Sequence, residues 1–381
     1  MTTGITPIAG DEQHARIERA RQLMRDRGLD AMFLESGSSL FYYTGVRWGR
    51  SERPFGAVIP VRGDPAWVAP AFEEQRAWEL LQPATDLRVW QEDESPYRIV
   101  AGILRDRGAA MGRIGIEESV RFFIFDGLRA EMGGAQFVSA TPVTAGGRMI
   151  KSPAEVALLQ RANAITLRAI DEAVRTLRPG MSQHELAASV SAATAALGGE
   201  SDGALVAFGK ESAFPHGSSK RQELREGDVV LVDAGCRVQG YVSDVTRTIV
   251  YGTPTQRQRD VWEVEKRAQR AAFDAAQPGA RCESVDAAAR RLIAEAGFGP
   301  GYTLPGLPHR TGHGIGLDGH EWTNFVKGNT ATLEPGMCFS DEPTIAIYGE
   351  FGIRLEDCLH ITEKGPVFFT GQSESIEKPF G

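Results

Sequence analysis

The chain has 381 residues, of which 42% are hydrophobic and 24% are charged, and its formal net charge is −8 at neutral pH. This composition is typical of a soluble globular protein with material for two domains, and it excludes a disordered or fibrous chain. The negative charge and the lack of a basic block argue against nucleic acid as a partner, while the lack of a signal peptide or a long apolar run predicts no membrane span and a cytoplasmic location.

Helical and strand patterns alternate along the first 148 residues, which predicts α/β layering. We expect helices at residues 13–27, 38–44, 72–81, 97–107 and 122–132, and strands at residues 30–34, 55–60, 66–70, 87–90 and 113–117. Ser38 is expected to cap the second helix. The stretch from Gly146 to Ser152 combines two glycines with a serine placed as an N-cap and a proline after it, so we place the domain boundary near there and divide the chain into residues 1–148 and 149–381.

The second part repeats one pattern: a long helix, a Pro-Gly break, a shorter helix and a β hairpin. In the first copy the helices span residues 154–177 and 182–197, with Ser152 and Ser182 as N-caps; in the second copy they span 257–276 and 284–296. Two such copies indicate an internal duplication, with two half-units related by a pseudo-twofold axis and the hairpins facing each other.

Each predicted hairpin carries two acidic residues among apolar ones. Asp233 and Asp244 lie in the hairpin at residues 229–250, and Glu342 and Glu356 lie in the hairpin at residues 339–361. Between the hairpins, the glycine-rich turn at residues 309–317 presents His313. Any one of these residues could be an ordinary solvated group or an ion-pair partner, as Glu356 could be for Arg354. Together, however, four carboxylates and one imidazole form the ligand set of divalent metal ions, which would neutralise the clustered charge.

Four segments carry a resemblance to a known family. They are VDAGCRVQGYVSDVTRT, HRTGHGIGLDGHE, LEPGMCFSDEP and GIRLED, in that order. Together they resemble the pita-bread metallopeptidases, which include methionine aminopeptidase, aminopeptidase P and prolidase. The first 150 residues are similar, more weakly, to the amino-terminal domain of creatinase and prolidase relatives. The resemblance implies an α/β (α+β) protein with a creatinase/prolidase-type domain followed by a pseudo-twofold catalytic domain.

The resemblance also implies a metal centre and a set of substrate residues. Two divalent ions would be bridged by Asp244 and Glu356, with Asp233 on one ion and His313 and Glu342 on the other, and would activate a bridging water as hydroxide. Manganese is the metal we favour, and Co, Zn or Fe also suit these ligands. Residues that match substrate-side groups of prolidase and aminopeptidase P are His216, His309, His320 and Arg354.

The function that this resemblance implies is hydrolysis of the bond between an N-terminal residue and proline in short peptides, by a homodimer. A Xaa-Pro dipeptidase is favoured, a Xaa-Pro aminopeptidase stays open, and methionine aminopeptidase fits less well because it lacks a domain like residues 1–148. The alternatives are a creatinase-like amidinohydrolase or another small-metabolite hydrolase or lyase on the same fold, and a non-catalytic binding protein. No HExxH or GxSxG motif supports a zincin or a serine hydrolase.

Two details qualify this expectation. Relatives commonly have a tyrosine near the substrate where this chain has Ala346, and Tyr348 follows two residues later. The four cysteines, Cys236, Cys282, Cys338 and Cys358, have no CxxC spacing, so we expect free thiols.

Overall fold

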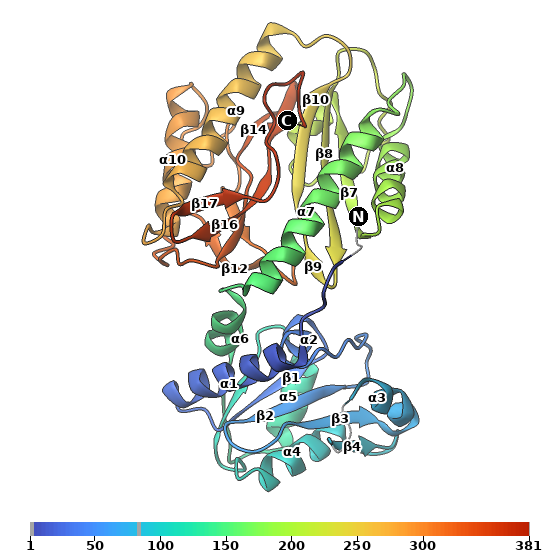
Figure 1. Ribbon diagram of the computed structural model, residues 1–381, viewed down its shortest axis with the longest axis vertical. Coiled ribbons are helices and arrows are strands. Elements are labelled where there is room, and N and C mark those ends of the chain that lie inside the picture. The colour runs from blue at the N-terminus through green and yellow to red at the C-terminus, as the bar shows by residue number, and fades with distance from the viewer. Residues whose placement is uncertain (1–3, 82–84, 381) are drawn as a thin grey trace. The chain divides into compact units, whose positions relative to one another are not determined.

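The computed structural model describes residues 4–81 and 85–380, which form two compact units (Figure 1). One unit consists of residues 8–148, and the other consists of residues 149–380 together with residues 4–7. Within these described ranges, no helix combines the length and the apolar character that crossing a membrane requires.

The unit of residues 8–148 is built on a six-stranded mixed sheet in the order β4-β3-β2-β1-β5-β6. Its strands are β1 (Ala31–Glu35), β2 (Gly56–Pro60), β3 (Ala66–Pro70), β4 (Asp86–Trp90), β5 (Arg113–Ile116) and β6 (Gln136–Ser139). Its helices are α1 (Gly10–Asp26), α2 (Ser38–Thr44), α3 (Glu74–Leu80), α4 (Pro96–Asp106), α5 (Phe122–Glu131) and α6 (Thr141–Arg148), with a short 3-10 turn η1 (Ala71–Glu73) before α3. The apolar faces of α4 and α5 pack with β1 and β5 in one core, so the predicted α/β layering is confirmed.

One local prediction in this unit is wrong, and one helix and one strand were not predicted. Ser38 is the first helical residue of α2, and the N-cap position belongs to Gly37. The glycines at 146 and 147 lie inside α6, which the sequence analysis missed together with β6. A Cβ on Gly147 would lie 2.6 Å from the Tyr43 hydroxyl oxygen, so the glycine lets α6 pack closely. Its carbonyl accepts a hydrogen bond from the Tyr42 hydroxyl at 2.7 Å.

The second unit contains helix pairs and antiparallel sheets. The first half comprises α7 (Pro153–Val174), α8 (Gln183–Ala196), β7 (Glu200–Phe208), η2 (Gly209–Ala213), β8 (Val229–Val238), β9 (Tyr241–Val242) and β10 (Val245–Val250). The second half comprises α9 (Gln256–Ala275), α10 (Cys282–Glu295), β11 (Gly312–Gly314), β12 (Glu321–Phe325), β13 (Cys338–Asp341), β14 (Thr344–Ile347), β15 (Phe351–Arg354), β16 (Asp357–Thr362) and β17 (Gly365–Phe368). The predicted N-caps Ser152 and Ser182 are both confirmed, and each forms a capping box, with Glu155 and Glu185 respectively.

The same strand order occurs in both halves. After α7 and α8, the chain forms neighbouring antiparallel strands in the order β7-β8-β10; after α9 and α10, it forms β11-β13-β16. In Figure 1, α9 and α10 lie on one side of the strands and α8 on the other. The two halves meet where the backbones of Thr246 and Glu356 exchange two hydrogen bonds of 3.2 Å. The repeat predicted from the sequence therefore exists as a repeated topology.

The acidic hairpins are more irregular than predicted. Only Asp233 lies inside a strand, β8, whereas Asp244 lies between β9 and β10, Glu342 between β13 and β14, and Glu356 between β15 and β16. The first turn falls at Gln239 and Gly240, which have positive φ angles, and Gly235 belongs to β8. Each break in a strand frees an acidic side chain from the regular alternation of the sheet, so side chains from four segments can converge.

Candidate metal centre

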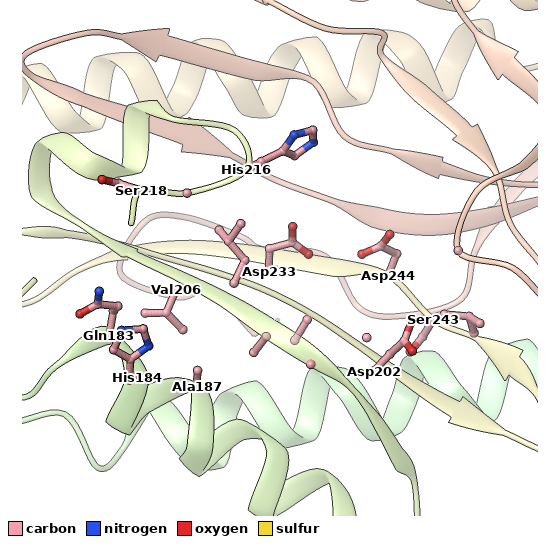
Figure 2. Close-up of a pocket in the computed structure, with 18 of the residues that line it drawn as sticks. Gln183, His184, Ala187, Asp202, Val206, His216, Ser218, Asp233, Ser243 and Asp244 are labelled. Carbon is pink, nitrogen blue, oxygen red and sulfur yellow. The ribbon is translucent and has the colours of Figure 1, made fainter. Parts of the chain in front are cut away.

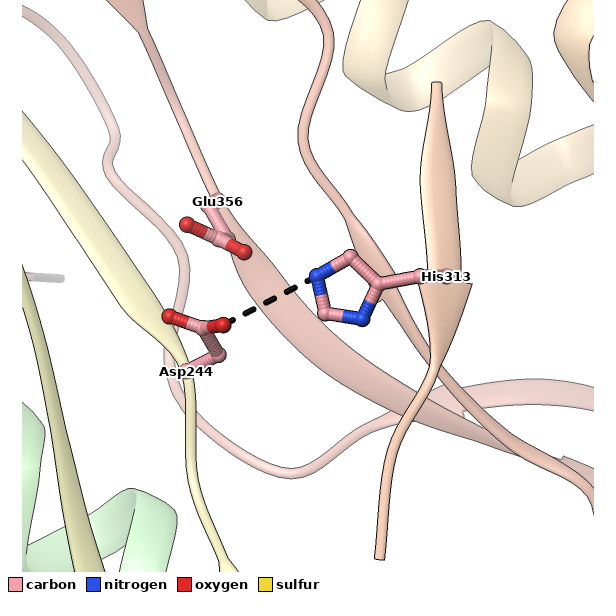
Figure 3. Close-up of side chains that lie close together, drawn as sticks. All are labelled: Asp244, His313 and Glu356. Atoms are coloured by element: carbon pink, nitrogen blue, oxygen red, sulfur yellow. Dashed lines mark ion pairs between the residues drawn. The ribbon is translucent and has the colours of Figure 1, made fainter. Parts of the chain in front are cut away.

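Three side chains meet in the middle of the second unit (Figure 3). Asp244, His313 and Glu356 offer ligand atoms that all lie within 4.8 Å of one another. The Nε2 atom of His313 is 3.7 Å from Asp244 Oδ2 and 3.0 Å from Glu342 Oε1, so Glu342 joins the group. The side chains come from both halves of the duplicated fold, which explains why the cluster needs both hairpins.

Asp233 reaches the same cluster from the opposite strand. Asp233 in β8 lies opposite Thr246 of β10, and Thr246 follows Asp244 by two positions. Its Oδ2 atom accepts a hydrogen bond of 2.5 Å from Nη2 of Arg354, and both side chains are largely buried. The structure thus brings together all five side chains that the sequence analysis proposed as ligands.

The electrostatics of the cluster favour a bound cation. Burial raises the pKa values of Asp244 and Glu356 well above their ordinary range, and the negative charges of the neighbouring carboxylates raise them further. Burial also raises the pKa of Glu342, but the electrostatic interaction and the hydrogen bond with the His313 ring outweigh burial and bring this pKa to about 2. Burial lowers the pKa of Arg354, yet the surrounding carboxylates outweigh it and the pKa is raised. One arginine faces four carboxylates, so this oxygen-rich and imidazole-containing set fits divalent metal ions.

Hydroxyl groups and backbone atoms fix the orientation of these side chains. Thr246 Oγ1 donates to Glu356 Oε2 at 2.6 Å, and Ser340 Oγ donates to Glu342 Oε1 at 3.2 Å. The Nδ1 atom of His313 lies 3.1 Å from the carbonyl oxygen of Gly314, which leaves Nε2 directed at the carboxylates. Sequence reasoning missed Thr246 and Ser340; the only signal for them was a hydroxyl residue two positions from Asp244 and from Glu342.

A glycine makes room for the imidazole strand. A Cβ on Gly312, next to His313, would lie 2.1 Å from the carbonyl oxygen of Ser340. Only glycine therefore allows β11 to approach β13 this closely. The backbone N–H of His313 donates to Ser340 Oγ at 3.0 Å, which ties the histidine to the strand that precedes Glu342.

The three histidines predicted on the substrate side occupy different environments. His309 is held on both ring nitrogens, with Nδ1 2.7 Å from the Arg310 carbonyl oxygen and Nε2 3.0 Å from Thr344 Oγ1. The His320 ring packs edge-on against His313, with centroids 4.1 Å apart. Partial burial and the neighbouring His313 lower the pKa of His320 to about 4. Burial likewise lowers the pKa of His309, so both rings are neutral at pH 7.

His216 is exposed and lines a cavity of about 610 Å³ that also reaches Asp233 and Asp244 (Figure 2). The same cavity extends to Gln183 and His184 at the start of α8, which the sequence analysis did not identify. Figure 2 shows His216 on a loop above Asp233 and Asp244. The cavity gives a small molecule access to the acidic cluster.

Arg354 connects the loop of His216 with the acidic cluster. Besides Asp233, it donates from Nη1 to the Pro215 carbonyl oxygen at 3.0 Å and from Nε to Thr246 Oγ1 at 3.1 Å. β15 ends at Arg354, and Glu356 lies beyond it, in the break before β16. Thr246, which binds both side chains, is the link between them.

The remaining details concern position 346 and the cysteines. Ala346 is fully buried, while Tyr348 is 55% exposed and stacks on Phe214 with ring centroids 5.1 Å apart. All four cysteines are buried free thiols, as predicted. Cys358 lies opposite Ser340 in the sheet, so it does not face Cys338.

Comparison with known proteins identifies two domain families along the chain. Residues 157–363 match metallopeptidase family M24, and residues 16–150 match the creatinase/prolidase N-terminal domain. The probable dipeptidase PepE of Mycobacterium tuberculosis is 37% identical over 92% of both chains, and a Xaa-Pro dipeptidase of Lactobacillus helveticus is 32% identical over 95% of this chain and 98% of its own.

Solved structures give the same assignment. The dipeptidase PepE from Mycobacterium ulcerans has a TM-score of 0.89 at 33% identity and covers 97% of this chain and 98% of its own. A prolidase from Thermococcus sibiricus has a TM-score of 0.87 at 29% identity, over 94% and 97% of the two chains. The resemblance and the fold predicted from the sequence are confirmed, and the family implies divalent metal cofactors. The protein therefore belongs to metallopeptidase family M24 and is a metal-dependent peptidase that carries a creatinase/prolidase-type N-terminal domain.

Proposed function

We propose that this protein is a dinuclear-metal Xaa-Pro dipeptidase. The observation that carries the proposal is that four carboxylates and one imidazole converge, while Arg354 is the arginine that pairs with one of these carboxylates. The substrate class comes from similar proteins, which are named Xaa-Pro dipeptidase and prolidase. Short peptides with proline at the second position are the substrates that we propose.

The roles of the ligands follow the family pattern. Asp233, Asp244, His313, Glu342 and Glu356 would together hold the two ions. When bound, divalent ions act as Lewis acids and lower the pKa of a coordinated water towards neutrality. The donor set suits Mn, Co, Fe and Zn, and we favour Mn because four of the five donors are carboxylates.

The chain's own residues supply binding and proton transfer. Cleavage before proline releases a secondary amine, so its nitrogen must receive a proton. His216 and His320 are the candidates for this task, since both are exposed; His320 is neutral at pH 7, so its ring would have to take up a proton before it could pass one to the nitrogen. His309 is fixed on both ring nitrogens, which suits a role in binding the substrate. Arg354 would hold the His216 loop in place through Pro215.

The experiment that tests this proposal is chelation followed by metal restoration. Protein stripped with a chelator should lose hydrolysis of Ala-Pro and regain it with Mn²⁺, Co²⁺ or Zn²⁺, while Ala-Ala should be a much poorer substrate. Activity that is indifferent to chelation would contradict the proposal and favour the creatinase-like alternative, which needs no metal. Turnover of Ala-Pro-Ala at the rate of Ala-Pro would indicate an aminopeptidase. The homodimer and the cytoplasmic location stay predictions, and a monomeric mass in solution would contradict the first.

A further inference from the structure

Arg247 is a buried arginine whose side chain contacts the backbone of the proposed ligand Glu356 and of Thr246, which pairs with it. It lies in β10, three residues after Asp244, and its side chain is 1% exposed. Its Nη1 atom donates to the carbonyl oxygen of Thr246 at 3.1 Å and to that of Glu356 at 3.0 Å. It therefore contacts the two residues whose backbones connect the halves of the fold.

Asp357 pairs with this guanidinium and extends the network. Its Oδ1 atom accepts from Arg247 Nη2 at 2.7 Å and from Thr370 Oγ1 at 3.0 Å. Its Oδ2 atom accepts from Gln269 Nε2 at 3.1 Å, and the same amide lies 3.4 Å from the carbonyl oxygen of Asp341. Asp357 follows Glu356 and Asp341 precedes Glu342, so the network holds the neighbour of each glutamate ligand.

The end of the chain completes the coordination of the guanidinium. Arg247 donates from Nη2 to the Gly371 carbonyl oxygen at 2.9 Å and from Nε to the Pro379 carbonyl oxygen at 2.8 Å. Ser373 Oγ also donates to the Pro379 carbonyl oxygen, at 2.8 Å, which closes this C-terminal loop of residues 371–379 on itself. The Arg247 side chain thus links the C-terminal loop to the backbones of Thr246 and Glu356.

The buried pair of Arg247 and Asp357 contributes more to a fixed arrangement of the backbone than to net stability. Taking an arginine and an aspartate out of water costs about as much as their attraction returns, so a buried pair is weak evidence for net stabilisation. What the pair does provide is a fixed arrangement, because the planar guanidinium donates in set directions. Glu356 lies in a break between β15 and β16, where no regular ladder fixes its backbone apart from the bridge to Thr246.

We infer that Arg247 is a positioning residue: held by Asp357 and the C-terminal loop, it fixes the backbone of Glu356 and so places the Glu356 carboxylate for metal binding. The inference rests on the proposed function, because it assigns a role toward the proposed metal site. On this inference, the C-terminal loop of residues 371–379 contributes to the proposed metal site indirectly, through Arg247.

The test compares metal binding by full-length variants. Arg247→Lys keeps the charge but cannot make the forked contacts, and Thr370→Val removes only one hydrogen bond to Asp357. The control is Glu377→Gln, which removes the ion pair of the C-terminal loop with Arg259 at the surface. Each stripped protein is titrated with Co²⁺, whose visible absorption reports both affinity and ligand geometry, and kcat and KM for Ala-Pro are measured separately.

We expect Arg247→Lys to weaken Co²⁺ binding by about 10-fold to 100-fold and to change the absorption spectrum, as loss of groups that orient metal ligands does. Thr370→Val should show a smaller change in the same direction, kcat should fall more than KM rises, and Glu377→Gln should match the wild type. Unchanged Co²⁺ affinity in folded Arg247→Lys would overturn the inference. If that variant does not fold, unchanged affinity in Thr370→Val overturns it. A wild-type protein that binds no Co²⁺ would instead overturn the proposed function and this inference with it.

Discussion

Arg354 donates a 2.5 Å hydrogen bond from Nη2 to Oδ2 of Asp233, and this is the only ion pair with an arginine or lysine that the five proposed ligands make within residues 4–81 and 85–380. The other carboxylates of the cluster have hydroxyl or imidazole partners. Among the residues that the structure describes, Arg354 therefore provides the one arginine or lysine charge that pairs directly with these carboxylates. A metal ion at Asp233 must share this carboxylate with Arg354.

Replacing Arg354 with glutamine should destabilise the metal-free protein. The change leaves the buried carboxylates without a cation, and breaking a buried pair in this way costs about 3–5 kcal/mol. Adding Mn²⁺ should recover more of the free energy of unfolding in the variant than it adds in the wild type, because the ion then neutralises a cluster that has lost its arginine. Urea unfolding with and without Mn²⁺ measures both effects. The control Arg257→Gln, which breaks an exposed pair with Glu350, should cost less than about 1 kcal/mol; equal losses in the two variants would contradict the argument.

Replacing Glu356 with glutamine should change activity and stability in opposite directions. A proposed bridging ligand is lost, so kcat/KM should fall on the order of 10³-fold or more. The metal-free variant, however, loses one of the mutually repelling buried carboxylates, and its amide oxygen can still accept the hydrogen bond from Thr246. Its free energy of unfolding without metal should therefore equal or exceed that of the wild type. Glu350→Gln, at the exposed turn between β14 and β15, is the control for activity, and an active Glu356→Gln protein would remove Glu356 from the metal site.

Glu265 should make stability decrease as pH rises. This α9 residue is fully buried, and neither carboxylate oxygen has a hydrogen-bond partner of good geometry among the residues that the structure describes. Burial raises the pKa of Glu265 well above its ordinary value, and the charge of Arg354 opposes this only in part; Asp341, also buried, faces it with a raised pKa of its own. Above the ordinary glutamate pKa of about 4.3 the unfolded chain releases the proton while the folded protein keeps it.

The unfolded state therefore binds fewer protons, and the free energy of unfolding falls by up to about 1.4 kcal/mol per pH unit until the pH passes the folded pKa. Glu265→Gln has no proton to lose at this site, so its stability should fall less steeply than that of the wild type between pH 5 and pH 8. This range lies above the ordinary glutamate pKa of about 4.3. Urea unfolding across this range compares the two slopes, which is more informative than the absolute stabilities because a buried amide has its own desolvation cost. Parallel slopes would mean that Glu265 is ionised in the folded protein.

The sequence predicted the regular elements and the acidic cluster for physical reasons that act locally. Capping boxes such as Ser182 with Glu185 depend on residues three apart, and carboxylates in apolar runs are costly wherever they lie. It did not predict α6, because its alanine, glycine and threonine residues give a weak apolar stripe and the helix depends on contacts with Tyr42 and Tyr43. Nor did it predict the strand breaks at Asp244 and Glu356, since these depend on pairing between residues more than one hundred positions apart. Arg247 was missed for the same reason: apart from the neighbouring Thr246, its partners lie 109 to 132 residues away.

The four cysteines should be unreactive in the folded protein. Each is buried, and burial raises the pKa of Cys282 to about 11 and that of Cys338 to about 12, so almost no thiolate is present at pH 7. A thiol reagent such as DTNB should label none of them rapidly under native conditions and all four after unfolding in guanidinium without reductant. Two labelled thiols after unfolding would reveal a disulfide. Fast labelling before unfolding would instead show that at least one cysteine is accessible.

Introducing a tyrosine at position 346, where the family resemblance suggests one, should damage this protein rather than improve it. Ala346 is fully buried in β14 and lies opposite Gly352 of β15, and a Cβ on Gly352 would come within 2.3 Å of the Ser212 carbonyl oxygen. Side chains at opposite positions of an antiparallel pair share one face of the sheet, so the face at Ala346 is already packed against residues 212 and 213.

Ala346→Tyr should therefore lower the free energy of unfolding by about 1–3 kcal/mol through overpacking, with no gain in kcat/KM for Ala-Pro. Tyr348→Ala is the matched control: its ring is exposed and stacks only on Phe214 among the described residues, so its loss should cost about 1 kcal/mol or less. Thermal unfolding and steady-state kinetics of both variants test this. A stable Ala346→Tyr protein with higher kcat/KM would mean that the side chain at position 346 reaches the substrate cavity, and that the hairpin of β14 and β15 can move away from residues 212 and 213 to admit it.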